Sequence, residues 1–87
     1  MRQYLIESPH SKSECLTAIT LVQAAGYLTH FKWGCPDGAH CGWAMIEADN
    51  ESEALLSVPT LIRRKAHVTP IVEYTSKEIE MMHEQKH

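Results

Sequence analysis

The stretch His30-Phe31-Lys32-Trp33-Gly34-Cys35-Pro36-Asp37-Gly38-Ala39-His40-Cys41-Gly42-Trp43 decides how the rest of the chain is arranged. Residues on either side of its centre alternate in apolar character, and the centre carries Pro36 and the pair Asp37-Gly38, which are strong turn signals. The pattern predicts a β-hairpin with strands over residues 27–33 and 40–48. Two of the three cysteines and two of the six histidines fall in this stretch. Soft metal ligands are therefore concentrated around a predicted turn.

The chain before the hairpin predicts a strand and a helix. Residues 2–7 are rich in strand formers, and Ser11 with Glu14 fits a capping box that begins a helix. An apolar stripe that includes Leu16 continues the helix to Ala25, and Gly26 supplies a left-handed C-terminal cap. The first half of the chain thus predicts the order strand, helix, strand, strand.

The chain after the hairpin predicts a broken helix, a strand and a further helix. Val58-Pro59 interrupts the second helical segment, and Pro70 places the following strand, over residues 67–74, at a sheet edge or a bulge. Thr75 with Glu78 repeats the capping pattern and begins a short C-terminal helix. The second half therefore adds a helix, a strand and a terminal helix.

This order is that of the ferredoxin-like βαββαβ unit. We expect one α+β domain over residues 1–87, with a four-stranded antiparallel sheet in the order 4-1-3-2 and an added C-terminal helix. In that topology strands one and two end at the same edge of the sheet, where strands three and four begin. The residues expected to gather at this edge are His10, Cys15, Cys35, His40, Cys41 and His67, of which all but His67 are candidate ligands.

Length and composition limit the function classes. Eighty-seven residues form one domain with a small core, for which a metal or a partner subunit is a useful source of stability. The net charge of −3 is spread along the chain without a basic stripe, so no nucleic-acid partner is expected. No apolar run approaches the roughly 20 residues of a membrane span, and no signal peptide is recognised. We therefore expect a cytoplasmic protein without a membrane partner, in which an odd number of cysteines suits reduced thiols or a metal.

The hairpin ligands suit a transition metal. Cys35 and His40 form a C-x4-H pair, and thiolate with imidazole binds zinc, nickel, copper or iron. Adjacent strand residues point to opposite faces, so Cys41 can join His40 on one metal only if Cys41 still lies in the turn. Cys35 and His40 are therefore the expected core pair, completed by His10 and by Cys15 or Cys41.

Other roles for the same residues stay open. Cys35 and Cys41 can instead form a disulfide that acts as a redox switch, and buried cysteines often pack simply as small apolar groups. Trp33 and Trp43 can pack across the hairpin or line a pocket, with His30 as a further pocket residue.

Five segments of the chain resemble small bacterial proteins of unknown function that are similar to members of the dimeric α/β-barrel superfamily. These segments are Tyr4-Leu5-Ile6-Glu7-Ser8-Pro9-His10, Glu14-Cys15-Leu16, Phe31-Lys32-Trp33-Gly34-Cys35, Gly38-Ala39-His40-Cys41-Gly42-Trp43-Ala44, and Val58-Pro59 with Leu61-Ile62-Arg63. The resemblance covers nearly the whole chain and implies a homodimer. Some members of the superfamily bind nickel or other metals, and others are monooxygenases, haem-degrading enzymes or lactone isomerases. Where the related pattern has a small polar residue after the hairpin histidine, this chain has Cys41.

The predicted third strand supports a homodimer independently, because it offers Trp43 and Met45 on one face and Ala44 and Ile46 on the other. Helices cover one face of a sheet, and a partner subunit can cover the second.

Three functions follow from these patterns. The first is a small homodimeric metal-binding protein, acting in metal handling or sensing, with Cys35, His40 and His10 as ligands. The second is a dimeric-barrel enzyme, a monooxygenase or isomerase acting on a small apolar or aromatic substrate, with His30 or His40 as acid or base. The third is a structural or interaction module without a site.

Overall fold

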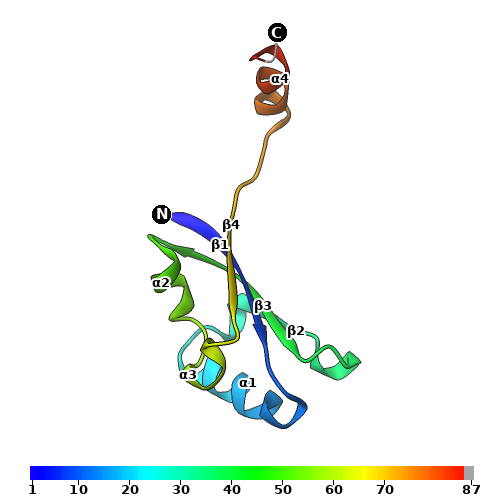
Figure 1. Cartoon of the computed structure of the whole chain (residues 1–87), viewed down its shortest axis with the longest axis vertical. Helices are drawn as coiled ribbons and strands as arrows, with labels where there is room; N and C mark the ends of the chain where they lie inside the picture. The colour runs from blue at the N-terminus through cyan, green and yellow to red at the C-terminus, as the bar shows by residue number, and fades with distance from the viewer. Residues whose placement is uncertain (86–87) are drawn as a thin grey trace.

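The computed structural model describes residues 1–85 of the chain. Its centre is a four-stranded antiparallel sheet in the order β2-β3-β1-β4. The two long strands, β1 (Arg2–Pro9) and β3 (Cys41–Ala48), pair along their whole length, while β2 (Phe31–Trp33) and β4 (His67–Ile71) form the edges (Figure 1). Pro70 lies in an edge strand, as predicted, because its missing amide would interrupt a central ladder.

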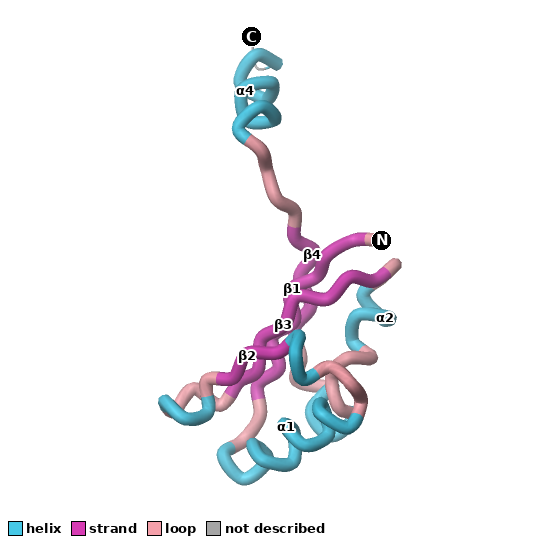
Figure 2. The backbone as a smooth tube through the Cα atoms, turned by 180° about the vertical axis from the view of Figure 1, so that it is seen from behind, coloured by secondary structure: helices cyan, strands magenta, loops and turns pink. Residues whose placement is uncertain are grey.

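Three helices cover one face of this sheet. They are α1 (Cys15–Ala24), α2 (Glu51–Leu55) and α3 (Thr60–Arg63), and Figure 2 shows α1 and α2 from behind, on the same side of the sheet. The core lies between these helices and alternate residues of the central strands, with Ile6 fully buried at its middle. The buried apolar residues are Tyr4, Ile6, Ala18, Val22, Phe31, Ala44, Ile46, Ala48, Ala54, Val58 and Ile62.

The period of two in the strands determines which side chains meet the helices. In β1 the even-numbered residues, such as Ile6 and Ser8, are buried on the inner face, and the odd-numbered ones, such as Leu5, face outward. His10 continues the inner series just beyond the strand and is 6% exposed. The side chain of His10, which follows the inner-face residues of β1, therefore lies at the candidate site.

The structure corrects the predicted fold class: the chain is α+β but does not form the ferredoxin-like arrangement. In the sheet β2-β3-β1-β4, the second strand has only three residues. The second long helix of a ferredoxin-like unit is replaced by two separate short helices, α2 and α3. The physical reason lies at Val58-Pro59, because proline lacks the amide that a continuous helix needs at this point. The interruption was predicted, but its consequence for the fold class was not.

The second strand is shorter than predicted because residues 28–30 form a turn. Gly26 adopts a positive φ of 86° that closes α1, as expected for a left-handed cap, and the Tyr27 amide then donates to the carbonyl of Val22. Leu28–His30 follow as a 3-10 turn. Of the strand predicted over residues 27–33, only the part from Phe31 onward is thus extended.

Helix α1 begins after a 3-10 turn (Lys12–Glu14), and the amide of Ser11 donates to Glu14 Oε1 at 2.8 Å, as the capping box predicted. The helix packs through Ala18 and Val22. Leu16, predicted as part of the apolar stripe, is instead 77% exposed. Small residues therefore allow α1 to lie close to the sheet.

Helix α4 (Ser76–Gln85) stands away from the sheet at the end of an extended segment (Figure 1). Every residue of this helix is exposed, and the molecule measures 54 × 28 × 21 Å. Within residues 1–85, none of the helices has the length and apolar character that a membrane crossing requires.

Candidate metal centre

Three residues from three separate segments meet at the end of the sheet. His10 follows β1, Cys15 is the first residue of α1, and Cys35 begins a 3-10 turn (Cys35–Asp37) in the hairpin. One ligand atom from each residue lies within 4.8 Å of the others. The structure thus brings together three of the five predicted metal ligands.

His10 is the centre of this group. Its Nε2 lies 3.2 Å from Cys15 Sγ and 3.1 Å from Cys35 Sγ. On the other side of the ring, Nδ1 lies 3.1 Å from the main-chain carbonyl oxygen of Ser8. A carbonyl oxygen only accepts, so this contact requires the proton on Nδ1, and in the neutral imidazole the lone pair of Nε2 is then directed at the two sulfurs.

Cys15 and Cys35 have their sulfurs at disulfide distance, with Cα atoms 6.9 Å apart. The pairing differs from the predicted alternative, a disulfide between Cys35 and Cys41. The reason is that Cys41 is already the first residue of β3, paired with Pro9, and its thiol lies 3.5 Å from the carbonyl oxygen of Gly42. Cys41 is the free cysteine among residues 1–85.

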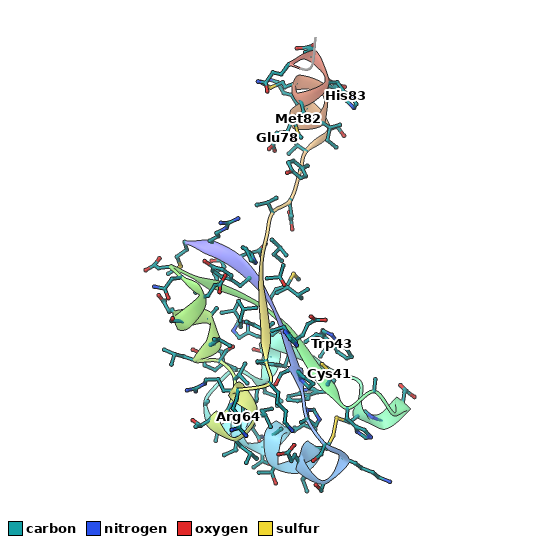
Figure 3. The ribbon with its side chains drawn as sticks, in the orientation of Figure 1. Cys41, Trp43, Arg64, Glu78, Met82 and His83 are labelled. Carbon is teal, nitrogen blue, oxygen red and sulfur yellow. A yellow bond between two sulfur atoms is a disulfide. The ribbon has the colours of Figure 1, made fainter. Side chains whose placement is uncertain are left out.

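Burial raises the pKa of the Cys41 thiol. A buried thiol resists losing its proton because the thiolate is poorly solvated. Cys41 shares the outer side of β3 with Trp43 (Figure 3), whereas His10 belongs to the inner face. These observations separate Cys41 from the three residues that meet.

The hairpin loop is held closed by Gly34. Its carbonyl accepts from the amides of Asp37 and Ala39 at 3.1 and 3.0 Å, and its amide donates to the carbonyl of Cys41 at 3.0 Å. A Cβ at Gly34 would lie 2.6 Å from the carbonyl oxygen of Ala39, so the loop requires glycine here. Gly34 thereby fixes the loop that carries Cys35 next to it.

Glu14 positions the start of α1, where Cys15 follows it. The hydrogen bond from the main-chain amide of Ser11, supported by the Ser11 side chain, lowers the pKa of the Glu14 carboxyl. A charged Glu14 at the first turn also suits the helix dipole. The local sequence Ser11 to Cys15 therefore sets both the helix start and the place of the thiol.

His40 lies beside the cluster without joining it. Its main-chain carbonyl accepts from the amide of His10 at 3.0 Å, which continues the pairing of β1 with β3 beyond the strands. The two imidazole rings have centroids 6.5 Å apart. Of the predicted core pair, Cys35 thus contacts the ring of His10 and His40 contacts its main chain.

The residues predicted to line a pocket fall on two different faces of the sheet. Trp33 stacks on Phe31 at 5.4 Å and lies 6.1 Å from His10, on the inner face. Trp43 and His30 instead line an open groove of about 400 Å³ on the outer face, together with Leu5, Thr29, Lys32, Ala44 and Met45. The aromatic residues that the enzyme hypothesis placed around one cavity are therefore not assembled into one.

One part of the site left no signal in the sequence. The carbonyl of Ser8 orients His10, but a main-chain group has no side chain by which a pattern can reveal it. The position of Cys15 did carry a signal, because His10 and Cys15 have the same spacing as Cys35 and His40.

Comparisons of the chain with protein family models, with curated proteins and with solved structures gave no match. The resemblance to dimeric α/β-barrel proteins therefore stays a prediction, and the argument for a function rests on the geometry of the site.

Proposed function

We propose that this protein binds a transition metal ion through His10, Cys15 and Cys35, and that zinc is its preferred ion. The observation that carries the proposal is the position of His10 Nε2, 3.1 and 3.2 Å from two sulfurs of separate segments. The proton that the Ser8 carbonyl requires on Nδ1 leaves Nε2 as a free ligand atom. A histidine whose other ring nitrogen donates to a carbonyl is the usual form of a zinc ligand.

The nitrogen–sulfur distances are close to those around an ion bound by the three groups. Tetrahedral zinc, with bonds of about 2.3 Å to sulfur and about 2.1 Å to nitrogen, holds its ligand atoms about 3.5–3.8 Å apart. The nitrogen–sulfur separations need to open by only a few tenths of an ångström to reach this range, whereas the two sulfurs, which are at disulfide distance, have to be reduced and to move apart. Side-chain torsions of Cys15 and Cys35 can supply such a movement, because Cys15 opens a helix and Cys35 lies in a turn.

The ligand types favour zinc over harder ions. Two thiolates and an imidazole are a soft to borderline set, which binds zinc, copper(I), nickel or iron and disfavours magnesium or calcium. Zinc has no geometric preference from its d-electrons and accepts the tetrahedral arrangement that three converging segments can provide. Nickel, copper and iron are the alternatives that the same titration tests.

Metal binding would link three parts of the chain that belong to separate elements of the fold. The ion would join the end of β1, the start of α1 and the hairpin, so its binding free energy would add directly to the stability of a small domain. We infer a role in metal handling or metal sensing, because a site that orders a loop changes the surface of the protein when the metal is present. A reducing compartment such as the cytoplasm would keep the two thiols available.

The test is a titration of reduced protein with zinc. The untagged chain is reduced, freed of metal with a chelator under anaerobic conditions, and titrated against a chromophoric zinc chelator. We expect one zinc per chain and a raised melting temperature, with both effects lost in Cys35→Ser. Cys41→Ser is the matched control, since Cys41 lies outside the cluster, and it retains zinc binding. A wild-type protein that takes up no zinc, nickel, copper(I) or iron(II) under these conditions rejects the proposal.

The contact between the two sulfurs favours a second candidate function, a thiol–disulfide switch formed by Cys15 and Cys35. In this reaction a disulfide such as oxidised glutathione accepts two electrons and is released as two thiols, while the two cysteine thiols lose their protons and form the S–S bond. Equilibration with glutathione buffers, followed by mass spectrometry of trapped thiols, measures it. Zinc protects the thiols from this oxidation if both functions use the same residues, and leaves the rate unchanged if they do not.

We also propose that the protein is a homodimer in which a second copy covers the outer face of the sheet. Leu5, Trp43 and Met45 line the groove on this face, and Met45 is 58% exposed. Lys32 and His30 lie at the same groove, whereas α4 carries the acidic residues Glu78, Glu80 and Glu84. The exposed residues Ile79 and Met82 give α4 an apolar side of its own. Apolar character and complementary charge therefore match α4 of one copy with the groove of another.

A further inference from the structure

The Nδ1 atom of His40 is buried and makes no hydrogen bond to any of residues 1–85. A buried imidazole nitrogen without a partner has lost its hydrogen bond to water and gained none in exchange, which is unfavourable. Such an atom therefore calls for a partner that supplies a bond in the functional state. The side chain belongs to a half-buried residue beside the metal site just described, so a metal ion is the nearest partner of suitable chemistry.

The backbone holds His40 in place for this role. The hydrogen bond from the His10 amide to the His40 carbonyl, at 3.0 Å, fixes the two main chains side by side. Their ring centroids are 6.5 Å apart with planes inclined at 58°. The ligand atoms of His40 do not lie within 4.8 Å of all three others, so the His40 side chain has to turn toward the cluster for both imidazoles to reach one ion.

The four candidate ligands His10, Cys15, Cys35 and His40 are spaced symmetrically in the sequence. His10 precedes Cys15 by five positions, and Cys35 precedes His40 by five positions. Each of two loops thus offers one imidazole and one thiol, in mirrored order. The first loop leads from β1 into α1, and the second joins β2 to β3.

From these three observations we infer that His40 is the fourth ligand and closes the site as Cys₂His₂ around one divalent ion. This inference rests on the proposed metal binding by His10, Cys15 and Cys35 and goes beyond it. Three protein ligands leave an open position for water or a substrate, as in catalytic zinc sites, whereas four protein ligands make the closed site that is typical of structural and regulatory zinc.

The charge and geometry of the four-ligand site also favour a particular ion, zinc. Two thiolates and two neutral imidazoles carry two negative charges, which cancel the two positive charges of a divalent ion. A neutral site suits the half-buried position between sheet and helix, because an uncompensated charge there would be poorly solvated. A tetrahedral set of two sulfurs and two nitrogens is characteristic of zinc. We therefore expect zinc to displace cobalt(II) from it.

The test uses cobalt(II), whose visible spectrum reports the number and kind of its ligands. Reduced full-length protein is loaded with cobalt(II) and compared with His40→Ala and His40→Cys. The wild-type spectrum is expected to be that of a tetrahedral ion with two sulfurs, and added free imidazole leaves it unchanged. His40→Ala opens one position, so added imidazole changes its spectrum. Since even the loss of a group that supports a ligand weakens metal affinity about 10–100-fold, zinc binding to His40→Ala falls at least about tenfold.

Two further variants make the outcome decisive. His40→Cys restores a fourth ligand, and its sulfur-to-cobalt absorption rises above that of the wild type, which guards against a variant that simply fails to fold. His30→Ala, an exposed histidine in the turn before β2, keeps the wild-type spectrum and affinity. If His40→Ala matches the wild type in spectrum and affinity, His40 is not a ligand, although the three-residue metal site still stands. If the wild type binds neither cobalt nor zinc, both proposals are rejected.

Discussion

Cys35 Sγ lies 3.1 Å from His10 Nε2, although the two residues are 25 positions apart in the chain. The contact exists because β1 pairs with β3 along its whole length, which brings the end of the first strand beside the loop that precedes the third. The sheet therefore assembles the candidate site, and substitutions at either partner test it.

Replacement of His10 by alanine removes the group that contacts both sulfurs. We expect His10→Ala to lose most of the stabilisation by zinc, because two thiols alone bind the ion more weakly. For a one-site ligand at 100 times its Kd, the stabilisation amounts to about 2.7 kcal/mol. Urea unfolding of reduced protein with and without zinc measures the effect. His30→Ala is the control, and an unchanged zinc effect in His10→Ala would contradict the assignment.

Replacement of Gly34 by alanine tests the loop that carries Cys35. The added Cβ would meet the carbonyl oxygen and the Cβ of Ala39 at 2.6 and 2.8 Å, so the loop has to open. We expect a loss of stability of about 1–3 kcal/mol, typical of overpacking, and a weaker response to zinc. Gly38→Asn is the comparison, because Gly38 has a φ of 88° with open space around its Cβ position and asparagine tolerates this conformation. Equal effects of the two changes would show that the contact with Ala39 is unimportant.

These two predictions rest on features that the sequence revealed to different degrees. The hairpin turn, the left-handed cap at Gly26 and the edge position of Pro70 follow from local backbone rules, and the structure has all three. The collection of His10, Cys15 and Cys35 at one end of the sheet was also expected, because strand topology alone brings the loops together.

The errors arose where packing overrides local pattern. Leu16 follows helical spacing but is exposed, because α1 approaches the sheet through Ala18 and Val22 instead. The three-residue β2 could not be read from propensity, since the turn at Leu28–His30 depends on how the chain leaves α1, whereas the division of the second helix was predicted from Val58-Pro59. The alternative of a disulfide with Cys35 named Cys41 instead of Cys15, because Cys41 is next to the turn in sequence but already belongs to β3.

The reactivity of Cys41 tests its separation from the site. Burial raises the pKa of its thiol, so at neutral pH the thiol stays protonated and reacts slowly, because the thiolate is the nucleophile. We expect alkylation of Cys41 by iodoacetamide to be slow at pH 7 and to accelerate as the pH rises past the usual range of a free cysteine. Mass spectrometry of zinc-loaded protein follows it, with Cys15 and Cys35 protected by the metal. Rapid modification of Cys41 at pH 7 is the result that would oppose this view.

The lowered pKa of the Glu14 carboxyl makes the stability of the fold depend on pH. Its pKa is lowered in the folded state by the hydrogen bond from the Ser11 amide. The stabilisation is therefore fully present above the unfolded-state pKa of about 4.3 and is lost as the pH falls through the lower folded-state value. Glu14→Gln should lower the urea midpoint slightly at pH 7 and leave it unchanged near pH 2. A difference that persists at low pH would assign the effect to something other than the charge.

The last prediction concerns the homodimer, in which helix α4 of one copy meets the outer face of the sheet of the other. Met82 and His83 lie on α4, far from Trp43 on the sheet of the same chain (Figure 3). An arm that leaves its own domain can reach the groove of a second copy, and two such exchanges would form a closed, symmetric pair. We expect sedimentation velocity to show a dimer for the wild type.

Substitution on either side of the proposed interface should release monomers. Met45→Glu places a charge in the groove and Met82→Glu places one on α4, so each should weaken dimerisation at least tenfold. Leu56→Glu is the matched control, because Leu56 is 59% exposed, close to the 58% of Met45, but lies just after α2 on the opposite face of the sheet. A wild type that is monomeric at every concentration tested rejects the dimer. A dimer that survives Met82→Glu but not Met45→Glu means that the two sheets meet directly and that α4 takes no part.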